Sequence, residues 1–233
     1  MRRTTRFRQL LSAPEILAMP CCHDALSARV LEQAGFEAIA AAGFGLSGSL
    51  LGMPDIGLLE GQELIAQYGR ICAAVQLPVF VDLDTGFGDG NNVVRAVQAA
   101  ERAGVAALFL EDQTFPKRCG HMAGKQVVPV EEYLPKLRAA LAARRDPDLV
   151  ITARTDAAAV LGVEEALRRA RLYAEAGADL VFVEALTSIE DMRAANALLA
   201  ECGTASMANL IEGGRTPLLS ARELQELGYA VVA

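Results

Sequence analysis

The chain of 233 residues contains no tryptophan, only two histidines and only three lysines. Two histidines, His23 and His121, cannot form a histidine-rich zinc site. An enzyme that forms an imine with its substrate would have to use Lys117, Lys125 or Lys136, and none of these is expected to project from a strand into a dry pocket. These scarcities argue against two common kinds of active site.

The sequence has no excess of basic residues and no long apolar run. Its formal net charge of −7 argues against a nucleic-acid partner. No apolar stretch approaches the roughly 20 residues of a membrane span. The basic residues 1–16 lack the apolar run of a secretory signal, and an Arg-rich organellar leader is the alternative there. The five cysteines form no C-x-x-C pair, so we expect a reduced, cytoplasmic protein.

Short apolar runs alternate with longer amphipathic runs along the whole chain. The predicted strands are 16–22, 37–42, 78–83, 106–111, 149–154, 179–184, 204–209 and 229–233. The predicted helices are 24–34, 60–75, 91–103, 131–144, 163–176, 188–201 and 220–227. Buried strands that alternate with helices predict a parallel sheet covered by helices. Eight strands favour a closed (β/α)₈ barrel as a single domain over 1–233, with a doubly wound open sheet as the alternative.

The last predicted strand coincides with the end of the sequence. No eighth helix follows Val231-Val232-Ala233, so the outer face of this strand would be bare in a closed barrel. We therefore expect that the sequence is a C-terminally truncated barrel.

Polar residues gather where the predicted strands end, which is where a barrel carries its chemistry. They are Asp82, Asp84, Glu111, Asp112, Arg154, Thr155, Asp156, Glu184 and Asn209. Asp82 and Asp84 offer hard oxygen ligands without a nearby histidine or thiolate, which favours Mg²⁺ or Mn²⁺, and Glu111 and Asp112 would act through water. Arg154 is suited to pair a substrate carboxylate in a fork. The alternative is that these charges merely cap strands in solvent.

A glycine-rich segment, Gly43-x-Gly45-x-x-Gly48, follows the second predicted strand and matches a dinucleotide-binding fingerprint. However, the residues after it do not resemble a helix start, and no acidic residue ends a strand about 20 positions further on. We expect its backbone N–H groups to hold a substrate carboxylate rather than a nicotinamide cofactor.

The strongest local pattern is the run from Lys117 to His121 in a long loop after the fourth strand. Lys117 and Arg118 precede Cys119, and Gly120 and His121 follow it. Positive neighbours stabilise a thiolate, so the pattern predicts a lowered pKa for Cys119 and acid–base or nucleophilic character. The other four cysteines lie in apolar runs and are expected in the core, and His23 is expected to be structural.

These motifs together resemble the isocitrate lyase/phosphoenolpyruvate mutase superfamily, from about residue 5 to the end. The matching segments are Gly43–Asp55, Asp82–Gly88, Leu110–Gln113, Lys117–His121, Ala153–Asp156 and Ala208-Asn209. The cysteine loop is similar to that of the carbon–carbon lyase branch, which acts on 2-methylisocitrate and alkylmalates. Members that transfer phosphorus or decarboxylate oxaloacetate typically lack this cysteine.

The resemblance implies metal-binding, substrate-binding and catalytic roles for the matched residues, and a cleavage activity for the protein. Asp82 and Asp84 would hold Mg²⁺, with Glu111 in its outer shell. The residues implied to contact the substrate are Gly43, Phe44, Gly120, Arg154, Glu184 and Asn209, with Asp55 near its metal side. The 117–121 loop would close, and Cys119 would protonate the carbanion left by cleavage of a 2-hydroxy di- or tricarboxylate.

Three alternatives and one departure accompany this interpretation. The alternatives are a carboxyphosphonoenolpyruvate or phosphoenolpyruvate mutase, an oxaloacetate decarboxylase, and a non-catalytic barrel that binds Mg²⁺ and a carboxylate. The departure is Ala42, where the family often has serine. Family membership further implies a homo-oligomer, commonly a tetramer, acting on a small carboxylic acid without a nucleic-acid or membrane partner.

Overall fold

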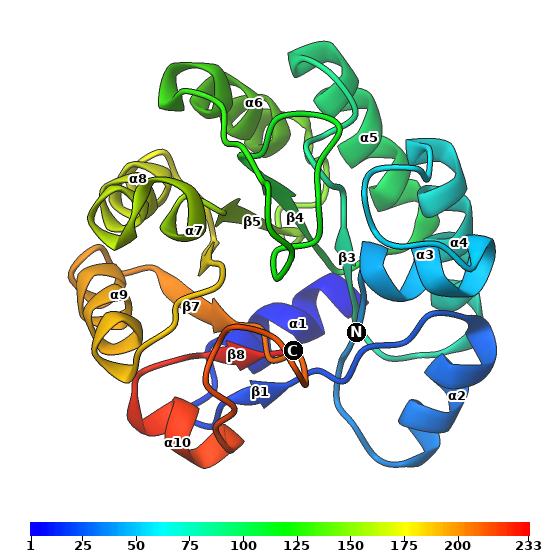
Figure 1. The fold of residues 1–233 in the computed structure, drawn as a ribbon. Coiled ribbons are helices and arrows are strands. Elements are labelled where there is room, and N and C mark those ends of the chain that lie inside the picture. Colours follow the sequence, from blue (N-terminus) through cyan, green and yellow to red (C-terminus); the bar gives the residue numbers. More distant parts are fainter.

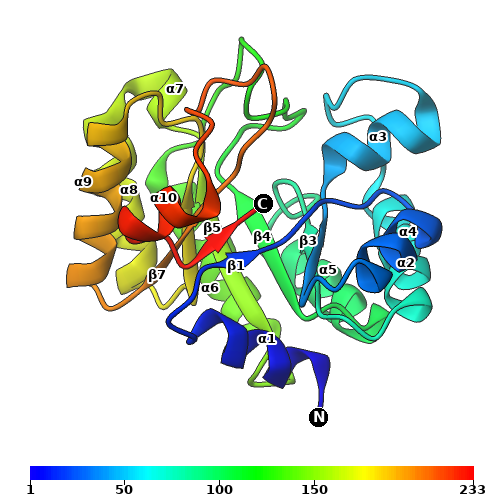
Figure 2. The same cartoon turned by 90° about the horizontal axis from the view of Figure 1, so that it is seen from below.

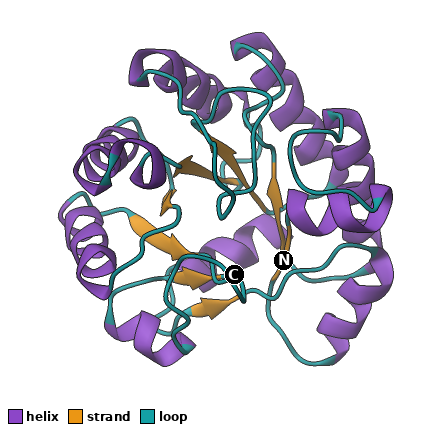
Figure 3. Cartoon of the chain, in the orientation of Figure 1, coloured by secondary structure: helices purple, strands orange, loops and turns teal.

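Eight parallel strands surround a common axis, and helices cover them from outside (Figures 1 and 3). The computed structural model describes all 233 residues. The strands are β1 Leu17–Ala18, β2 Ile39–Ala41, β3 Val79–Asp82, β4 Ala107–Glu111, β5 Val150–Thr155, β6 Leu180–Val183, β7 Ala205–Ala208 and β8 Val231–Val232. Sheet order runs from β2 through β8 to β1, and a bridge between Cys21 and Ala40 links the segment after β1 to β2. The predicted (β/α)₈ barrel is confirmed.

Ten helices surround the strands. They are α1 Arg3–Leu11, α2 Ala25–Gln33, α3 Gly43–Leu51, α4 Gly61–Ala74, α5 Gly90–Ala103, α6 Val130–Ala143, α7 Ala158–Leu161, α8 Val163–Glu175, α9 Ile189–Glu201 and α10 Ala221–Glu226. All eight predicted strands and all seven predicted helices are present, with ends that differ by a few residues. None of the helices is both long enough and apolar enough to cross a bilayer.

Local sequence explains how these elements begin and end. Asp89 begins α5, because its side chain accepts a hydrogen bond from Gly90 N and forms a capping box with Asn92. Gly104 ends the same helix in the left-handed conformation, with φ of 90°, which favours glycine. The next strand, β4, is buried along its whole length. Each such turn delivers a strand into the barrel with its carboxyl end on the same side.

Three helices, α1, α3 and α7, were not predicted from the sequence, and two of them, α1 and α3, lie at opposite ends of the barrel (Figure 2). The Arg-rich segment considered as a leader forms α1, which lies across the amino end and buries Phe7 and Leu10. Phe7 stacks on Phe80 inside the barrel, with ring centroids 6.2 Å apart. At the other end, the glycine-rich segment is itself helix α3. The expectation that no helix begins there was wrong, because α3 starts at Gly43.

Candidate active site

A cavity of about 290 Å³ opens at the carboxyl end of the barrel. Its lining joins most of the predicted site residues, namely Phe44, Asp55, Asp82, Cys119, Gly120, His121, Arg154, Glu184 and Asn209. These residues come from the ends of β3, β5, β6 and β7, from helix α3 and from two loops. The structure therefore assembles in one place side chains that are up to 165 positions apart in the sequence.

Asp82 and Asp84 form the acidic wall of this region. Asp82 Oδ1 accepts a hydrogen bond from Asp84 N at 2.7 Å, and its Oδ2 accepts one from Gly43 N at 3.2 Å. Asp84 adopts a positive φ of 48°, which is uncommon for a residue with a side chain. Burial and the charge of Asp82 raise the pKa of the Asp84 carboxyl to about 7. The wall is rigid and prefers a cationic neighbour.

Lys117 provides that cation. Its Nζ lies 2.7 Å from Asp55 Oδ2 and 2.8 Å from Asp84 Oδ1, and its side chain is almost completely buried. Burial alone would lower the pKa of Lys117, but the charges of Asp82 and Asp84 hold that pKa well above its usual value. Lys117 thus joins the loop that carries Cys119 to the acidic wall. It does not line the cavity.

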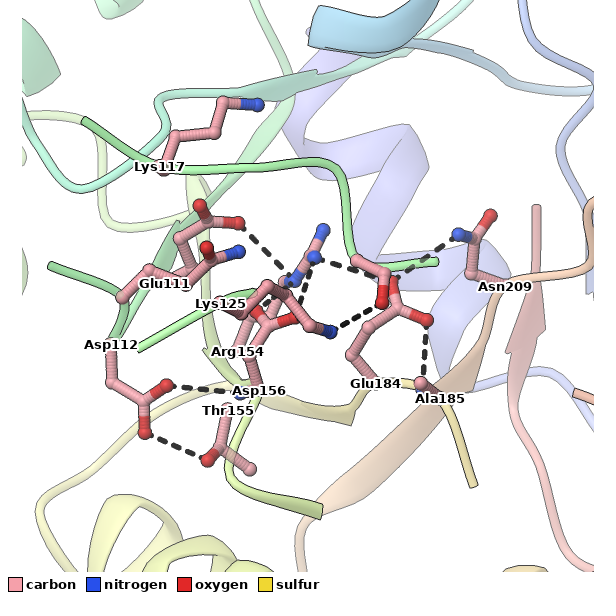
Figure 4. Close-up of polar contacts among 12 residues, drawn as sticks. Glu111, Asp112, Lys117, Lys125, Arg154, Thr155, Asp156, Glu184, Ala185 and Asn209 are labelled. Carbon is pink, nitrogen blue, oxygen red and sulfur yellow. Dashed lines mark hydrogen bonds and ion pairs between the residues drawn. The ribbon is translucent and has the colours of Figure 1, made fainter. Parts of the chain in front are cut away.

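Arg154 lies on the opposite side of the mouth (Figure 4). Its guanidinium binds Asp156 with two hydrogen bonds of 2.9 and 3.0 Å and forms ion pairs with Glu111 at 3.3 Å and Glu184 at 3.4 Å. It also stands over the rings of Phe109 and Phe182, 5.5 and 5.1 Å from their centroids. A guanidinium fixed by so many contacts is oriented in advance for a substrate carboxylate.

Cys119 is 9% exposed and lies on the loop above this arginine. Its backbone N–H donates to Asp55 O at 2.9 Å. Burial raises the pKa of the Cys119 thiol, and the hydrogen bond to the His121 backbone and the charge of Arg154 do not reverse this. The predicted lowering of this pKa was wrong, because sequence neighbours are not spatial neighbours: Lys117 binds carboxylates and Arg118 is exposed. A buried neutral thiol is a proton donor rather than a nucleophile.

Gly120 and His121 fasten this loop to β6. A Cβ atom at Gly120 would lie 2.5 Å from Nη2 of Arg154 and 2.5 Å from Cγ of Glu184, so only glycine fits. His121 Nδ1 accepts a hydrogen bond from Arg215 N at 3.0 Å, which leaves the proton of a neutral ring on Nε2. Nε2 lies 3.2 Å from Glu184 Oε1 and can donate to it. Asn209 Nδ2 donates to the other oxygen of Glu184 at 3.4 Å.

The buried carboxylates in this region are suitable ligands for a hard divalent cation. Glu111 Oε1 is buried without a hydrogen-bond partner, and burial raises the pKa of this carboxyl well above its usual value. All nearby candidates are carboxylate oxygens, the type of ligand that Mg²⁺ and Mn²⁺ prefer. However, no group of three His, Cys, Asp or Glu side chains converges on one point, and Lys117 Nζ lies 2.8 Å from Asp84 Oδ1. One or two of Asp82, Asp84 and Glu111 could hold a cation whose remaining positions are filled by water and substrate.

Several expectations for single residues need correction. Asp112, expected to act through water, accepts hydrogen bonds from Thr155, Arg169, Tyr173 and the Asp156 backbone and is fully buried behind the strand. It is structural.

The structure does not bring Arg118 to the cavity, because its side chain is exposed. Cys21, expected in the core, is exposed and lines the cavity together with His23. The helix cap expected near His23 is made by Asp24, which accepts a hydrogen bond from Ser27 N at 2.7 Å. Lys125, whose ammonium is buried against Asp156, was not predicted as a site residue.

Comparison with known proteins places this geometry in a family. The family model described as phosphoenolpyruvate phosphomutase matches residues 7–233. The chain belongs to this family. Among curated members, the 2,3-dimethylmalate lyase of Eubacterium barkeri is 45% identical over 231 residues, which cover 99% of this chain and 79% of that protein. The probable 2-methylisocitrate lyase 1 of Corynebacterium glutamicum is 44% identical over 99% of this chain and 75% of its own length.

Phosphomutase-family members with other activities are also similar to the chain. The carboxyvinyl-carboxyphosphonate phosphorylmutase of Arabidopsis thaliana is 44% identical over 99% of this chain and 68% of that protein. Among solved structures, a trigonal crystal form of 2,3-dimethylmalate lyase has a TM-score of 0.94 at 38% identity and covers 100% of this chain and 78% of its own. Oxaloacetate acetylhydrolase with 3,3-difluorooxalacetate has a TM-score of 0.94 at 36% identity, covering 98% and 78%.

A third solved member of the phosphomutase family is phosphonopyruvate hydrolase in complex with oxalate and Mg²⁺. It has a TM-score of 0.85 at 32% identity and covers 100% of this chain and 80% of its own. The lyase names among the relatives support a carbon–carbon lyase, which agrees with the cysteine loop of this chain.

Proposed function

We propose that the protein is a divalent-metal-dependent lyase that cleaves a carbon–carbon bond of an alkylmalate or of 2-methylisocitrate. The products are an oxo acid and a second carboxylic acid. The observation that carries this proposal is the position of Cys119, a buried neutral thiol that lines the same cavity as Arg154, Glu184 and Asp82. The names of the relatives support the same reaction class.

The chemistry needs one proton to leave an oxygen and one to reach a carbon. When the 2-hydroxy acid gives its hydroxyl proton to one of the carboxylates that line the cavity, the oxygen forms a carbonyl and the adjacent carbon–carbon bond breaks. The electron pair of that bond goes to the carbon beside the second carboxylate. The Cys119 thiol then gives its proton to this carbon, so that a saturated acid is released and the thiolate regains its proton in a later step. Arg154 holds the substrate by its carboxylate and the loop excludes water.

A divalent cation held among Asp82, Asp84 and Glu111 would act as a Lewis acid and stabilise the negative charge on the substrate's hydroxyl oxygen when its proton leaves. The Mg²⁺ complex of phosphonopyruvate hydrolase supports a divalent metal in this family. We propose Mg²⁺, with Mn²⁺ as the alternative. Titration of the protein with each metal by calorimetry, with and without oxalate, checks the choice.

The charges of the cavity favour a dicarboxylate over a tricarboxylate. The acidic lining residues are Asp55, Asp82, Glu184 and Glu212, and Arg154 is the only lysine or arginine among the residues that line it. Phe44, Leu210 and Ile211 add apolar surface to the lining. A third carboxylate would face acidic or apolar groups, whereas a methyl group would be buried favourably. We therefore expect 2,3-dimethylmalate to be a better substrate than 2-methylisocitrate.

A substrate panel tests the proposal directly. The protein with Mg²⁺ is incubated separately with 2,3-dimethylmalate, 2-methylisocitrate and isocitrate, and release of the oxo acid is followed with a hydrazine reagent. We expect turnover of at least one alkylated substrate and its loss in EDTA. If none of the substrates is cleaved, the proposed activity is wrong.

A mutase is the second candidate, because a phosphorylmutase is 44% identical to the chain. Phosphonopyruvate and carboxyphosphonoenolpyruvate are therefore added to the panel and followed by phosphorus NMR. Oxaloacetate is added to detect decarboxylation or hydrolysis, given the similarity to oxaloacetate acetylhydrolase. Stabilisation by oxalate and Mg²⁺ without any turnover would favour the non-catalytic binding barrel. The homotetramer and the cytoplasmic location stay predictions, and analytical ultracentrifugation checks the former.

A further inference from the structure

Two of the three lysines bury their ammonium groups at the two ends of one segment, residues 117–125, which we call the thiol loop. Lys117 binds Asp55 and Asp84, as described above. Lys125 binds Asp156 Oδ1 at 2.7 Å and donates a second hydrogen bond to the carbonyl of Gly120. The side chain of Lys125 is 2% exposed. The activity outlined above uses Cys119 and Arg154 but gives Lys125 no part.

The partner of Lys125 is also the main partner of Arg154. Asp156 Oδ1 accepts from Lys125 and from Arg154 Nη2 at 3.0 Å, and Oδ2 accepts from Arg154 Nε at 2.9 Å (Figure 4). The Asp156 backbone is held in turn by Asp112, because Asp156 N donates to Asp112 Oδ1 at 2.9 Å. One fixed carboxylate therefore connects the thiol loop to the arginine of the cavity.

The electrostatics agree with this geometry. Burial raises the pKa of Asp156, but the charges of Arg154 and Lys125 outweigh burial and lower that pKa to about 2. A buried carboxylate between two cations loses much of its stabilisation if one cation leaves. Displacement of the loop from its position in the structure would separate Lys125 from Asp156, so the pair favours that position.

We propose that Lys125 is a positioning residue, whose ammonium holds the Gly120 carbonyl over the cavity and shares Asp156 with Arg154. It thereby fixes the position of Cys119 relative to the guanidinium of Arg154. The expected effect of Lys125 on turnover rests on the proposed lyase function. The expected effect of Lys125 on the loop does not depend on any substrate.

Hydrogen exchange and kinetics of Lys125→Met test the proposal. The amides of Cys119 and Met122 report on the loop, because they donate to Asp55 O and Cys119 O, both at 2.9 Å. We expect these amides to exchange at least about tenfold faster in the variant, while amides of β4 and β5 stay protected. With the panel substrate of highest turnover, we expect kcat to fall about 100-fold, because a small misplacement of reacting groups is that expensive.

Controls separate this role from a general loss of structure. Lys136→Met changes the third lysine, which lies on α6 outside the loop, and should leave both readouts unchanged. Lys125→Gln loses the charge but keeps a donor for Gly120, and we expect an intermediate effect. If Lys125→Met unfolds, the same criteria apply to Lys125→Gln. Unchanged loop exchange in a folded variant overturns the proposal, even if no substrate is ever turned over.

Discussion

The two ends of the barrel hold charge in opposite ways. All eleven buried charged side chains of the protein lie at or directly behind the carboxyl ends of the strands. The acids are Asp55, Asp82, Asp84, Glu111, Asp112, Asp156 and Glu184, and the bases are Lys117, Lys125, Arg154 and Arg169. At the amino end, Arg2 and Arg8 of the α1 region pair with Asp148 and Asp179 while all four stay partly exposed.

This difference separates stability from function. Partly exposed ion pairs need little desolvation and each contributes little, so the amino end depends on the apolar packing of α1. Burial of seven carboxylates with only four cations carries a large desolvation penalty. Such an arrangement is expected where the charges serve binding and catalysis rather than stability.

The largest expected effect is that of Cys119→Ser. The hydroxyl of serine is a far weaker acid than a thiol, so we expect kcat to fall about 10²- to 10⁴-fold while the fold is kept. Steady-state kinetics with the best substrate and a thermal melt provide the two measurements. Cys21→Ser is the matched control, since Cys21 also lines the cavity but has no assigned role. Full activity in Cys119→Ser would exclude the thiol as the acid.

The second largest effect is expected at the amino end of the barrel, where a substitution should lower stability without changing activity. Phe7 is fully buried and stacks on Phe80, so Phe7→Ala should lower the free energy of unfolding by about 3–5 kcal/mol. Urea denaturation measures it, and the folded fraction should keep its kcat. Phe44→Ala makes the same change at the mouth, where Phe44 is 57% exposed. If Phe44→Ala lost as much stability as Phe7→Ala, the contrast between the two ends would fail.

The pH dependence distinguishes a thiol acid from a thiolate. Burial raises the pKa of the Cys119 thiol above its ordinary value, so the thiol is protonated near neutral pH. We expect this group to leave kcat unchanged around neutral pH and to reduce it only as pH rises through the raised pKa. A reaction that needs the thiolate would instead accelerate up to about tenfold per pH unit. A pH–rate profile of the wild type, with Cys119→Ser beside it, decides between them.

The smallest effect is a gain in stability at the acidic wall. The raised pKa of Asp84 means that its contribution to stability is lost as pH rises from about 4 towards 7. At pH 8 in EDTA, Asp84→Asn should therefore stabilise the protein by ~1 kcal/mol, or about 2–4 °C in the thermal midpoint. The gain should vanish at pH 4, and activity should be lost. A lower midpoint at pH 8 would show that the ion pair with Lys117 outweighs burial.

The sequence predicted the barrel well because its signals were local. Apolar runs and helix-ending glycines mark the strands and helices independently of tertiary contacts. Helix α3 was missed because GFGLSGSLL contains three glycines, which disfavour a helix unless the surrounding structure supports it. Helix α1 did carry a signal, since Thr4, Phe7 and Leu10 recur every three residues and are all buried.

The candidate site was predictable in its residues but less so in its electrostatics. Asp82, Arg154 and Cys119 do meet at one cavity, because parallel strands end on one side of the sheet. Glu111 and Asp112 could have been separated from the sequence, because consecutive strand residues face opposite sides. The pKa of Cys119 and the role of Lys125 depend on burial and on partners distant in the sequence. No local pattern carries that information.

Gly120 has a consequence for changing what the enzyme accepts. Since a Cβ atom there would collide with Arg154 and Glu184, the thiol loop meets these two residues with bare backbone, and position 120 cannot carry a side chain that selects a substrate. Phe44, Leu210 and Ile211 line the same cavity and can be varied more freely. A mutant library aimed at new hydroxy acids should vary these three positions and keep Gly120.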